Sequence, residues 1–322
     1  MSPLALLVEC NAKGEACALV TLVACYGTAP RRQGAQMAIA AGGQVCGSFS
    51  GGCLDHAVIE QGRQVLAEGS SRRVRYGAES PYLDLIMPCG SGLELQFDGA
   101  ISGSTIKTMA DAIKRRQSFT LHWSRPDAAP ACLIEGEANE IAPTHPSPPD
   151  SQRQNEAAVA VQLQPALRLL LAGSGDNLIA MARLALAAQI EVIALSQDSQ
   201  TRNKLEALTI NTVPLHSQHT IPPLDWDRFS AAITLFHEHE WEIPFLVQAL
   251  ASDAFFVGAM GSTRAQAQRL RQLGEAGVGE QDLTRLRGPI GLLPRARDPN
   301  ELAVSILADV MQAYRQVAFD EA

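Results

Sequence analysis

The stretch GSFSGGCLD, residues 47–55, places a cysteine directly after two glycines and before a run with helical periodicity. The N–H groups and the dipole at a helix N-terminus favour negative charge, so they lower the pKa of a cysteine there and stabilise its thiolate. Gly51 and Gly52 let a ligand approach the backbone closely. Cys53 is therefore a candidate nucleophile or a soft ligand to a metal centre. The alternative is a small buried residue at a helix start.

Two further stretches of the N-terminal third carry groups of the same kind. Cys89, in PCGSGLEL, precedes a glycine turn and a β-type run, where a functional thiol and a buried structural thiol fit the sequence equally well. Arg31 and Arg32, in GTAPRRQG, lie in a loop framed by Gly and Pro. Paired N–H groups of arginine can hold phosphate or carboxylate, and the alternative for this stretch is a solvated loop.

A glycine turn in the second half of the chain indicates contact with phosphate. In LLLAGSGDNL, Gly173 and Gly175 follow a β-type run and open a helical one. Leu178 stands where the dinucleotide-binding fingerprint has its third glycine, and Asp198 comes later than a ribose-binding carboxylate usually does. The sequence therefore favours a phosphate-binding or structural turn over NAD(P) binding.

A second glycine turn, VGAMGSTR, ends another β-type run of the same half. It places Gly258, Gly261 and Arg264 at the edge of the predicted sheet where ligands usually bind. Two such turns at one edge favour a ligand more strongly than one turn does.

The segment HEHE directly follows the β-type run AAITLF. Alternation along an extended chain puts His237 and His239 on one face, where they could form a pair of metal ligands. Two ligands alone do not hold a structural zinc ion. Polar contacts to a ligand, or solvated loop residues, are the favoured interpretation.

The elements that must position these residues fall into two groups. In the N-terminal third, short β-type runs alternate with Gly and Pro turns and with one helical stretch, residues 54–68, which indicates an α+β domain. After a polar, Pro-rich stretch, continuous apolar runs alternate with helical patterns, which is typical of a parallel sheet covered on both faces. We therefore predict an α/β chain with an N-terminal domain over 1–140, a linker over 141–165 and a Rossmann-like domain with a mostly parallel sheet over 166–322.

Composition excludes some function classes. The net charge of -8 disfavours nucleic-acid binding, which needs clustered Lys and Arg. No apolar run reaches the length of a membrane span, and the N-terminal residues lack the pattern of a signal peptide, so we expect no membrane partner and a cytoplasmic protein. The seven cysteines are scattered without a Cys-x-x-Cys pair, which predicts free thiols.

The motifs, taken in order, resemble the XdhC/CoxI family of accessory proteins for molybdenum hydroxylases such as xanthine dehydrogenase. YGTAPRRQGAQMAI, GSFSGGCLDHAVI and PCGSGLEL resemble its N-terminal domain. LLLAGSGDNL, AFFVGAMGSTRAQAQRL, RGPIGL and ARDPNELAVSILADV resemble its C-terminal Rossmann domain. The connection after Pro126 is not covered, and GSGDNL, ALSQDS, CGSG and LFHEHE depart from the family pattern.

This resemblance implies a chaperone rather than a metabolic enzyme. Such a protein binds the molybdenum cofactor, a molybdopterin or its dinucleotide form, supports its sulfuration and inserts it into an apo molybdenum hydroxylase of the xanthine dehydrogenase or aldehyde oxidase type. A sulfur-donating cysteine desulfurase is a further implied partner, and a homodimer is the implied assembly. The implied cofactor-binding residues are Gly51, Gly52, Cys53, Cys89, Arg31, Arg32, Gly173, Gly175, Gly258, Gly261 and Arg264, with Cys53 as the contact to molybdenum.

Two other functions compete with the chaperone. One is an NAD(P)-dependent oxidoreductase built on the Rossmann half, for which His237 or His239 would be the proton-transfer residue. The other is a regulatory or scaffold protein that binds a partner without any small molecule, because fold alone does not settle function.

Overall fold

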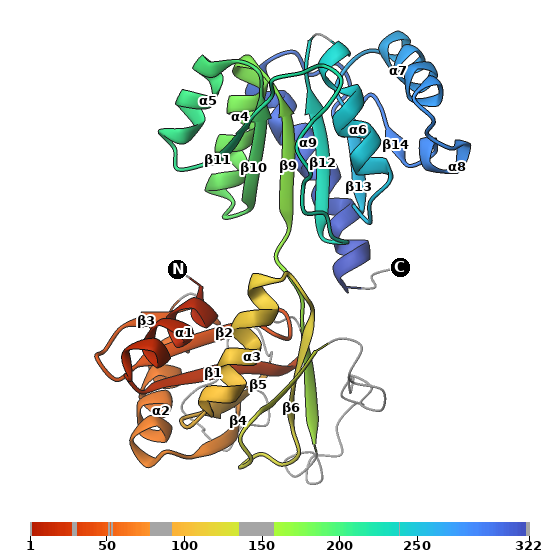
Figure 1. The fold of residues 1–322 in the computed structure, drawn as a ribbon. Coiled ribbons are helices and arrows are strands. Elements are labelled where there is room, and N and C mark those ends of the chain that lie inside the picture. The colour runs from red at the N-terminus through yellow and green to blue at the C-terminus, as the bar shows by residue number, and fades with distance from the viewer. Residues whose placement is uncertain are drawn as a thin grey trace. The chain divides into compact units, whose positions relative to one another are not determined.

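The computed structural model describes residues 2–27, 31–50, 52, 54–77, 92–134, 158–237 and 239–319. The chain divides into two compact units, residues 1–165 and residues 166–322 (Figure 1). Each unit contains its own clusters of buried apolar side chains. The predicted α/β class, an α+β unit followed by a Rossmann-like unit, is confirmed.

The first unit is built on an antiparallel sheet with the strand order β3-β2-β1-β5-β4. Its strands are β1 (Cys17–Tyr26), β2 (Gln36–Ala40), β3 (Val45–Cys46), β4 (Ser71–Gly77) and β5 (Gly92–Asp98). The remaining elements are the helices α1 (Pro3–Lys13), α2 (Asp55–Glu68) and α3 (Gly103–Lys114), and a second sheet with the order β7-β6-β8, formed by β6 (Phe119–Trp123), β7 (Ala131–Ile134) and β8 (Val159–Leu163).

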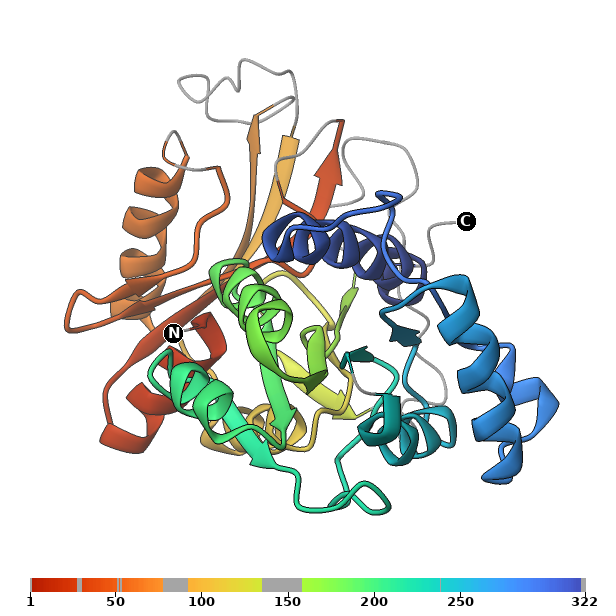
Figure 2. The same cartoon turned by 90° about the horizontal axis from the view of Figure 1, so that it is seen from above.

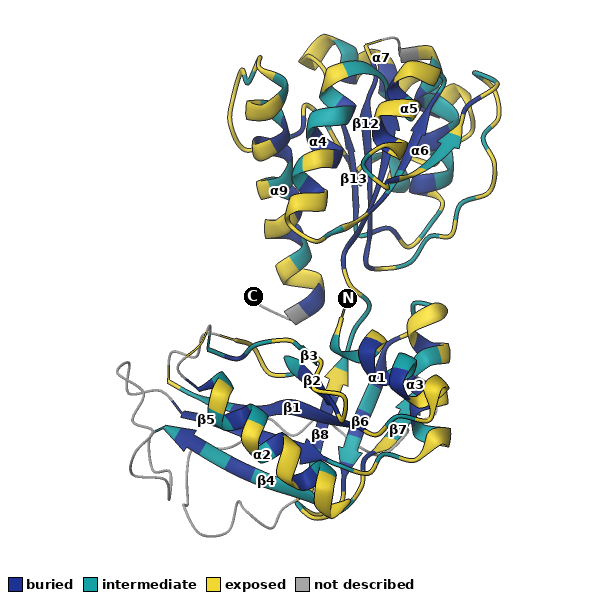
Figure 3. Ribbon diagram, turned by 90° about the vertical axis from the view of Figure 1, so that its left-hand side faces the viewer, coloured by how far each residue is buried: buried dark blue, intermediate teal, exposed yellow. Residues whose placement is uncertain are grey.

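Strand alternation gives the five-stranded sheet two different faces. On β5, Leu93, Leu95 and Phe97 pack against α2 in one apolar cluster. The opposite face of β1 and β2 packs against α1, α3 and β6. The burial pattern in Figure 3 follows this arrangement, with buried strands and helices exposed along their outer sides. Both faces of the sheet are therefore covered.

Strand β8 lies inside the range 141–165 that we predicted as a linker. It pairs antiparallel with β6, so the last part of this range contributes a strand to the first unit. Its buried residues, such as Val161, join the cluster of α1 and α3. Residues 141–157 lie outside the described residues.

The second unit contains a parallel sheet of six strands in the order β11-β10-β9-β12-β13-β14. This is the order of the doubly wound dinucleotide-binding fold, with its switch point between β9 and β12. The strands are β9 (Arg168–Gly173), β10 (Glu191–Ser196), β11 (Asn211–Pro214), β12 (Ser230–Leu235), β13 (Phe256–Ala259) and β14 (Leu286–Arg287).

Helices cover both faces of this parallel sheet. One apolar cluster joins the sheet to α4 (Gly175–Ala187), α5 (Ser199–Glu206) and α9 (Pro299–Phe319), and α4 and α9 lie side by side (Figure 2). The other cluster contains α6 (Ile243–Leu250) and α7 (Thr263–Glu275). The short helices η2 (His239–Trp241) and α8 (Glu280–Leu283) complete the unit. Because all six strands are parallel, the turns that follow them lie together at the carboxyl edge of the sheet.

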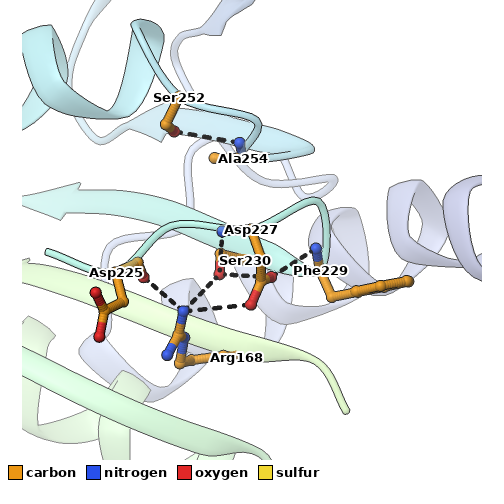
Figure 4. A network of polar contacts seen from close by, with 7 residues as sticks. All are labelled: Arg168, Asp225, Asp227, Phe229, Ser230, Ser252 and Ala254. Atoms are coloured by element: carbon orange, nitrogen blue, oxygen red, sulfur yellow. Dashed lines mark hydrogen bonds and ion pairs between the residues drawn. The ribbon is translucent and has the colours of Figure 1, made fainter. Parts of the chain in front are cut away.

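A buried arginine closes the opposite, amino edge. Figure 4 shows the Arg168 guanidinium among the loops before β12. Its Nη2 donates to the Asp225 carbonyl at 2.5 Å, to the Ser230 hydroxyl at 3.2 Å and to the Asp227 carboxylate at 3.3 Å. These contacts join the start of β9 to the start of β12, so Arg168 has a structural role.

Among the helices of the described residues, none is both long enough and apolar enough to cross a membrane.

Candidate functional site

The carboxylate of Asp55 organises the loop before α2. It accepts hydrogen bonds from the Ser48 hydroxyl at 2.5 Å, the Phe49 N–H at 2.8 Å and the Ser50 N–H at 3.2 Å. The Ser50 hydroxyl accepts in turn from the N–H of Leu54. Burial raises the pKa of Asp55, but these hydrogen bonds outweigh it and leave the pKa below its ordinary value. Asp55 therefore holds the loop as a carboxylate.

Two glycines of this loop have different roles. Gly47 adopts a φ of +103°, and a Cβ there would lie 2.3 Å from the Gln36 carbonyl oxygen, so the loop can pass β2 only with glycine. Gly52 adopts a φ of +139°, and a Cβ there would meet no atom within 4 Å. The space at the Cβ position of Gly52 is therefore open.

The loop that contains the predicted arginines lies at the same end of the five-stranded sheet as the loop before α2. Arg31 and Arg32 are exposed in the loop between β1 and β2. The Arg31 Nε donates to the Ser48 carbonyl at 3.1 Å, which joins this loop to the one organised by Asp55. The two predicted anion-binding stretches are separate in the sequence and contact each other through this hydrogen bond.

Three predicted residues of this region, Gly51, Cys53 and Cys89, lie outside the described residues. Helix α2 begins at Asp55, one residue after the predicted start and two positions after Cys53. Of the described cysteines, Cys10, Cys17, Cys25, Cys46 and Cys132 form no disulfide bond, as predicted.

Sequence reasoning missed a polar cluster at this edge. The Tyr26 hydroxyl donates to the Glu94 carboxylate at 2.9 Å, and the Arg75 guanidinium stacks on the Tyr26 ring at 4.1 Å from its centroid. The Arg73 Nε lies 3.8 Å from Glu94, and the side chain of Arg73 is 1% exposed. Burial and the neighbouring carboxylate raise the pKa of Tyr26 to about 12, so Tyr26 remains a hydrogen-bond donor.

A signal for this cluster was present in the sequence. In RRVRY and LELQF, charged or polar residues occupy every second position, which places them together on one face of neighbouring strands. Such a face is normally solvated, and only the tertiary structure buries its central residues.

Asp98 is the last residue of β5 on this polar face, and its side chain is buried. Its carboxylate accepts from the Ser71 hydroxyl at 3.0 Å and from the Trp123 Nε1 at 3.1 Å. Burial raises the pKa of Asp98 to about 7, although these hydrogen bonds oppose the shift. The folded unit therefore holds a proton on Asp98 at pH values where the unfolded chain releases it.

This proton makes stability depend on pH. Between about pH 4 and about pH 7 the unfolded state ionises Asp98 while the folded state stays protonated, so the contribution of Asp98 to stability is lost as the pH rises through this window. Asp98→Asn is expected to flatten that part of the pH profile of the urea midpoint. The fluorescence of Trp123, recorded with Trp226 and Trp241 replaced by Phe, should titrate in the parent and not in the Asp98→Asn variant. A parent profile without this slope would contradict the assignment.

The first glycine turn of the second unit is closed by its own chain. A Cβ at Gly173 would lie 2.9 Å from Leu235, so this glycine permits close packing of β9 on β12. The N–H of Gly175 donates to the Thr201 hydroxyl at 2.9 Å, and that hydroxyl contacts the Asp198 carboxylate at 2.5 Å. Asp198 also caps α5. The amide and the carboxylate that a dinucleotide would use are thus both bonded within the protein.

The second glycine turn contains one buried and two exposed predicted residues. Gly258 lies inside β13, where a Cβ would come within 2.6 Å of Ile290 and of Phe256, so this glycine serves packing. Gly261 follows the strand with a φ of +144°, and Arg264 lies in the first turn of α7. Both are exposed at the carboxyl edge of the sheet.

His237 also lies at this edge, after β12, and its side chain is exposed. The side chain of His239, its predicted metal-binding partner, is outside the described part of the structure. Within the ranges that the structure describes, no group of three His, Cys, Asp or Glu side chains could hold a metal ion.

Both units resemble parts of known proteins. Residues 10–77 match the XdhC and CoxI family, and residues 169–310 match the XdhC Rossmann domain. The chain is 31% identical over 305 residues to the molybdenum cofactor insertion chaperone PaoD of Escherichia coli strain K12, and the match covers 94% of this chain and 85% of that protein.

More distant relatives cover most of the chain as well. A protein of Bacillus subtilis strain 168, described as a probable subunit of xanthine dehydrogenase, is 22% identical over 94% of this chain and 95% of its own length. A crystal structure of a xanthine dehydrogenase from Bacillus halodurans superposes with a TM-score of 0.74 at 18% identity, covering all of this chain and 98% of that one. At this identity the structure supports the fold alone.

Proposed function

Because this chain belongs to the XdhC and CoxI family, we propose that it is an accessory chaperone that binds the molybdenum cofactor and inserts it into a molybdenum hydroxylase. The observation that carries the proposal is that Asp55 holds residues 48–50 beside the loop of Arg31, with open space at the Cβ position of Gly52. The cofactor is cargo in this function, and binding is stoichiometric without turnover.

The residues at this edge fit an anionic, phosphate-bearing cargo. Arg31 and Arg32 are exposed, Arg31 contacts the Ser48 carbonyl of the neighbouring loop, and guanidinium groups hold phosphate oxygens. In the proposal, Arg31 and Arg32 hold the phosphate of the cofactor. The thiolate of Cys53 contacts molybdenum beside the backbone of Gly51 and Gly52.

The finer steps of the proposal concern sulfur and assembly. A thiolate is a soft ligand and a sulfur nucleophile, so Cys53, with Cys89 as a second thiol, can protect the cofactor while a terminal sulfur is installed. We propose a cysteine desulfurase as the sulfur donor, a xanthine dehydrogenase or aldehyde oxidase type enzyme as the recipient, and a homodimer as the active form. In the second unit, Gly261 and Arg264 are proposed to contact the phosphate or nucleotide end.

Retention of molybdenum tests the proposal directly. The full chain is mixed with freshly released molybdenum cofactor, and bound molybdenum is measured after gel filtration. We expect retention by the parent and its loss in Cys53→Ala. Cys132→Ala is the matched control, because burial raises the pKa of that thiol to about 11 and disfavours a thiolate. Equal retention by Cys53→Ala would remove Cys53 from the mechanism, and no retention by the parent would refute cofactor binding.

An NAD(P)-dependent oxidoreductase receives less support. The Gly175 amide is bonded to Thr201, and Asp198 caps a helix, so a dinucleotide would have to displace bonds that already exist. We therefore do not assign hydride transfer to this chain.

A further inference from the structure

Three side chains converge at the switch point of the parallel sheet. Asn177 lies in the first turn of α4, His237 follows β12 and Met260 follows β13. The Asn177 Nδ2 lies 3.3 Å from the His237 Nε2 and 3.4 Å from the Met260 Sδ. Strand β12 lies between β9 and β13, so these contacts tie together three neighbouring turns at the carboxyl edge. Ligands of doubly wound sheets bind at this edge.

The contacts fix the proton on the imidazole ring. A thioether sulfur only accepts, so its contact with Asn177 identifies the facing amide atom as the Nδ2 donor. The same Nδ2 faces the His237 Nε2, which must then accept. The ring proton of neutral His237 is therefore on Nδ1. Because the His237 side chain is exposed, this N–H can donate to solvent or to a ligand.

A buried ion pair holds the Met260 side of the cluster. The Arg269 Nε donates to the Glu242 carboxylate at 2.8 Å, and the two side chains are 1% and 0% exposed. The Arg269 Nη2 donates to the Met260 carbonyl at 2.8 Å, and the Met260 N–H donates to the Thr234 carbonyl at 3.0 Å. Burying two charges is costly, and here the pair fixes the turn that leads to Arg264.

We propose that His237 and Arg264 bind a phosphate group at this edge, with Asn177 as the positioning residue for His237. An imidazole N–H and a guanidinium are donors suited to phosphate oxygens, and Arg264 supplies the positive charge. The site lies on the β12–β13 side because the Gly175 amide on the β9 side is already bonded to Thr201. The proposal rests on the proposed function in one respect, that the phosphate belongs to the cofactor cargo.

Calorimetric titration of the full chain with inorganic pyrophosphate tests this site. We expect the parent to bind and both His237→Ala and Arg264→Ala to bind about tenfold or more weakly, because each loses a hydrogen bond to a charged ligand. Arg271→Ala, which removes an exposed positive charge farther along α7, is the control and should bind as the parent does. Thermal unfolding checks that each variant is folded. No binding by the parent, or equal binding by His237→Ala, would overturn the site.

A spectroscopic readout separates positioning by Asn177 from a general structural effect. In protein labelled with ¹⁵N-histidine, the His237 shifts should report an Nδ1–H tautomer in the parent and a mixture in Asn177→Leu, together with weaker pyrophosphate binding. An unchanged tautomer would refute the role of Asn177.

The molybdenum retention assay distinguishes this site from the proposed chaperone function. Retention by a parent that does not bind pyrophosphate would overturn only this site, and pyrophosphate binding without retention would overturn only the chaperone function.

Discussion

Asp55→Ala is expected to reduce retention of the molybdenum cofactor on the order of a hundredfold, because several hydrogen bonds to one carboxylate are lost together. Without the carboxylate, the Phe49 and Ser50 N–H groups and the Ser48 hydroxyl lose the acceptor that gathers them. Residues 48–50 would then sample many conformations, and the cargo would have to order them on binding. Gel filtration followed by molybdenum analysis gives the retained amount.

Two further variants sharpen this result. Asp55→Asn keeps one acceptor oxygen for the backbone N–H groups and is expected to retain an intermediate amount. Glu60→Ala changes an exposed carboxylate of the same helix and should retain cofactor as the parent does. Because the pKa of Asp55 is lowered, its loop contacts are present above its ordinary pKa and are lost only as the pH falls through the lowered value. If folded Asp55→Ala retained as much molybdenum as the parent, the loop would not be the binding site.

Arg269→Met is expected to destabilise the second unit by about 3–5 kcal/mol, because it leaves the Glu242 carboxylate buried without its charged partner. The variant also removes the donors to the Gln266 side chain and to the Met260 carbonyl. Urea denaturation followed by circular dichroism measures the loss as a lower midpoint.

The double variant Glu242→Leu with Arg269→Met distinguishes the cost of a lone charge from the value of the pair. Removing both charges should restore part of the lost stability, since a buried ion pair often contributes little beyond an apolar replacement. Arg63→Met, which breaks an exposed pair on α2, is the control and should leave the midpoint unchanged. An unchanged midpoint for Arg269→Met would show that Glu242 is not held as a buried charge.

Local patterns in the sequence determined much of the fold. Short β-type runs predicted strands in the first unit, the helical stretch 54–68 predicted α2, and continuous apolar runs predicted the buried strands of the second unit. These signals work because each strand or helix buries one face, and the spacing of apolar residues records it. Helix α1 was missed although Ser2 caps it, Pro3 opens it and Gly14 ends it with a φ of +70°.

Sequence alone also pointed to the stretches that we propose to carry chemistry, whereas the tertiary structure decided how they combine. Arg31 and the loop of Asp55 were recognised separately, and their contact through Ser48 depends on the pairing of β2 with β1 and β3. The bond between Gly175 and Thr201, and the meeting of Asn177, His237 and Met260, join residues far apart in the chain. The sequence contains no periodic pattern that predicts such contacts, because register and strand order, not local spacing, bring these side chains within hydrogen-bonding distance.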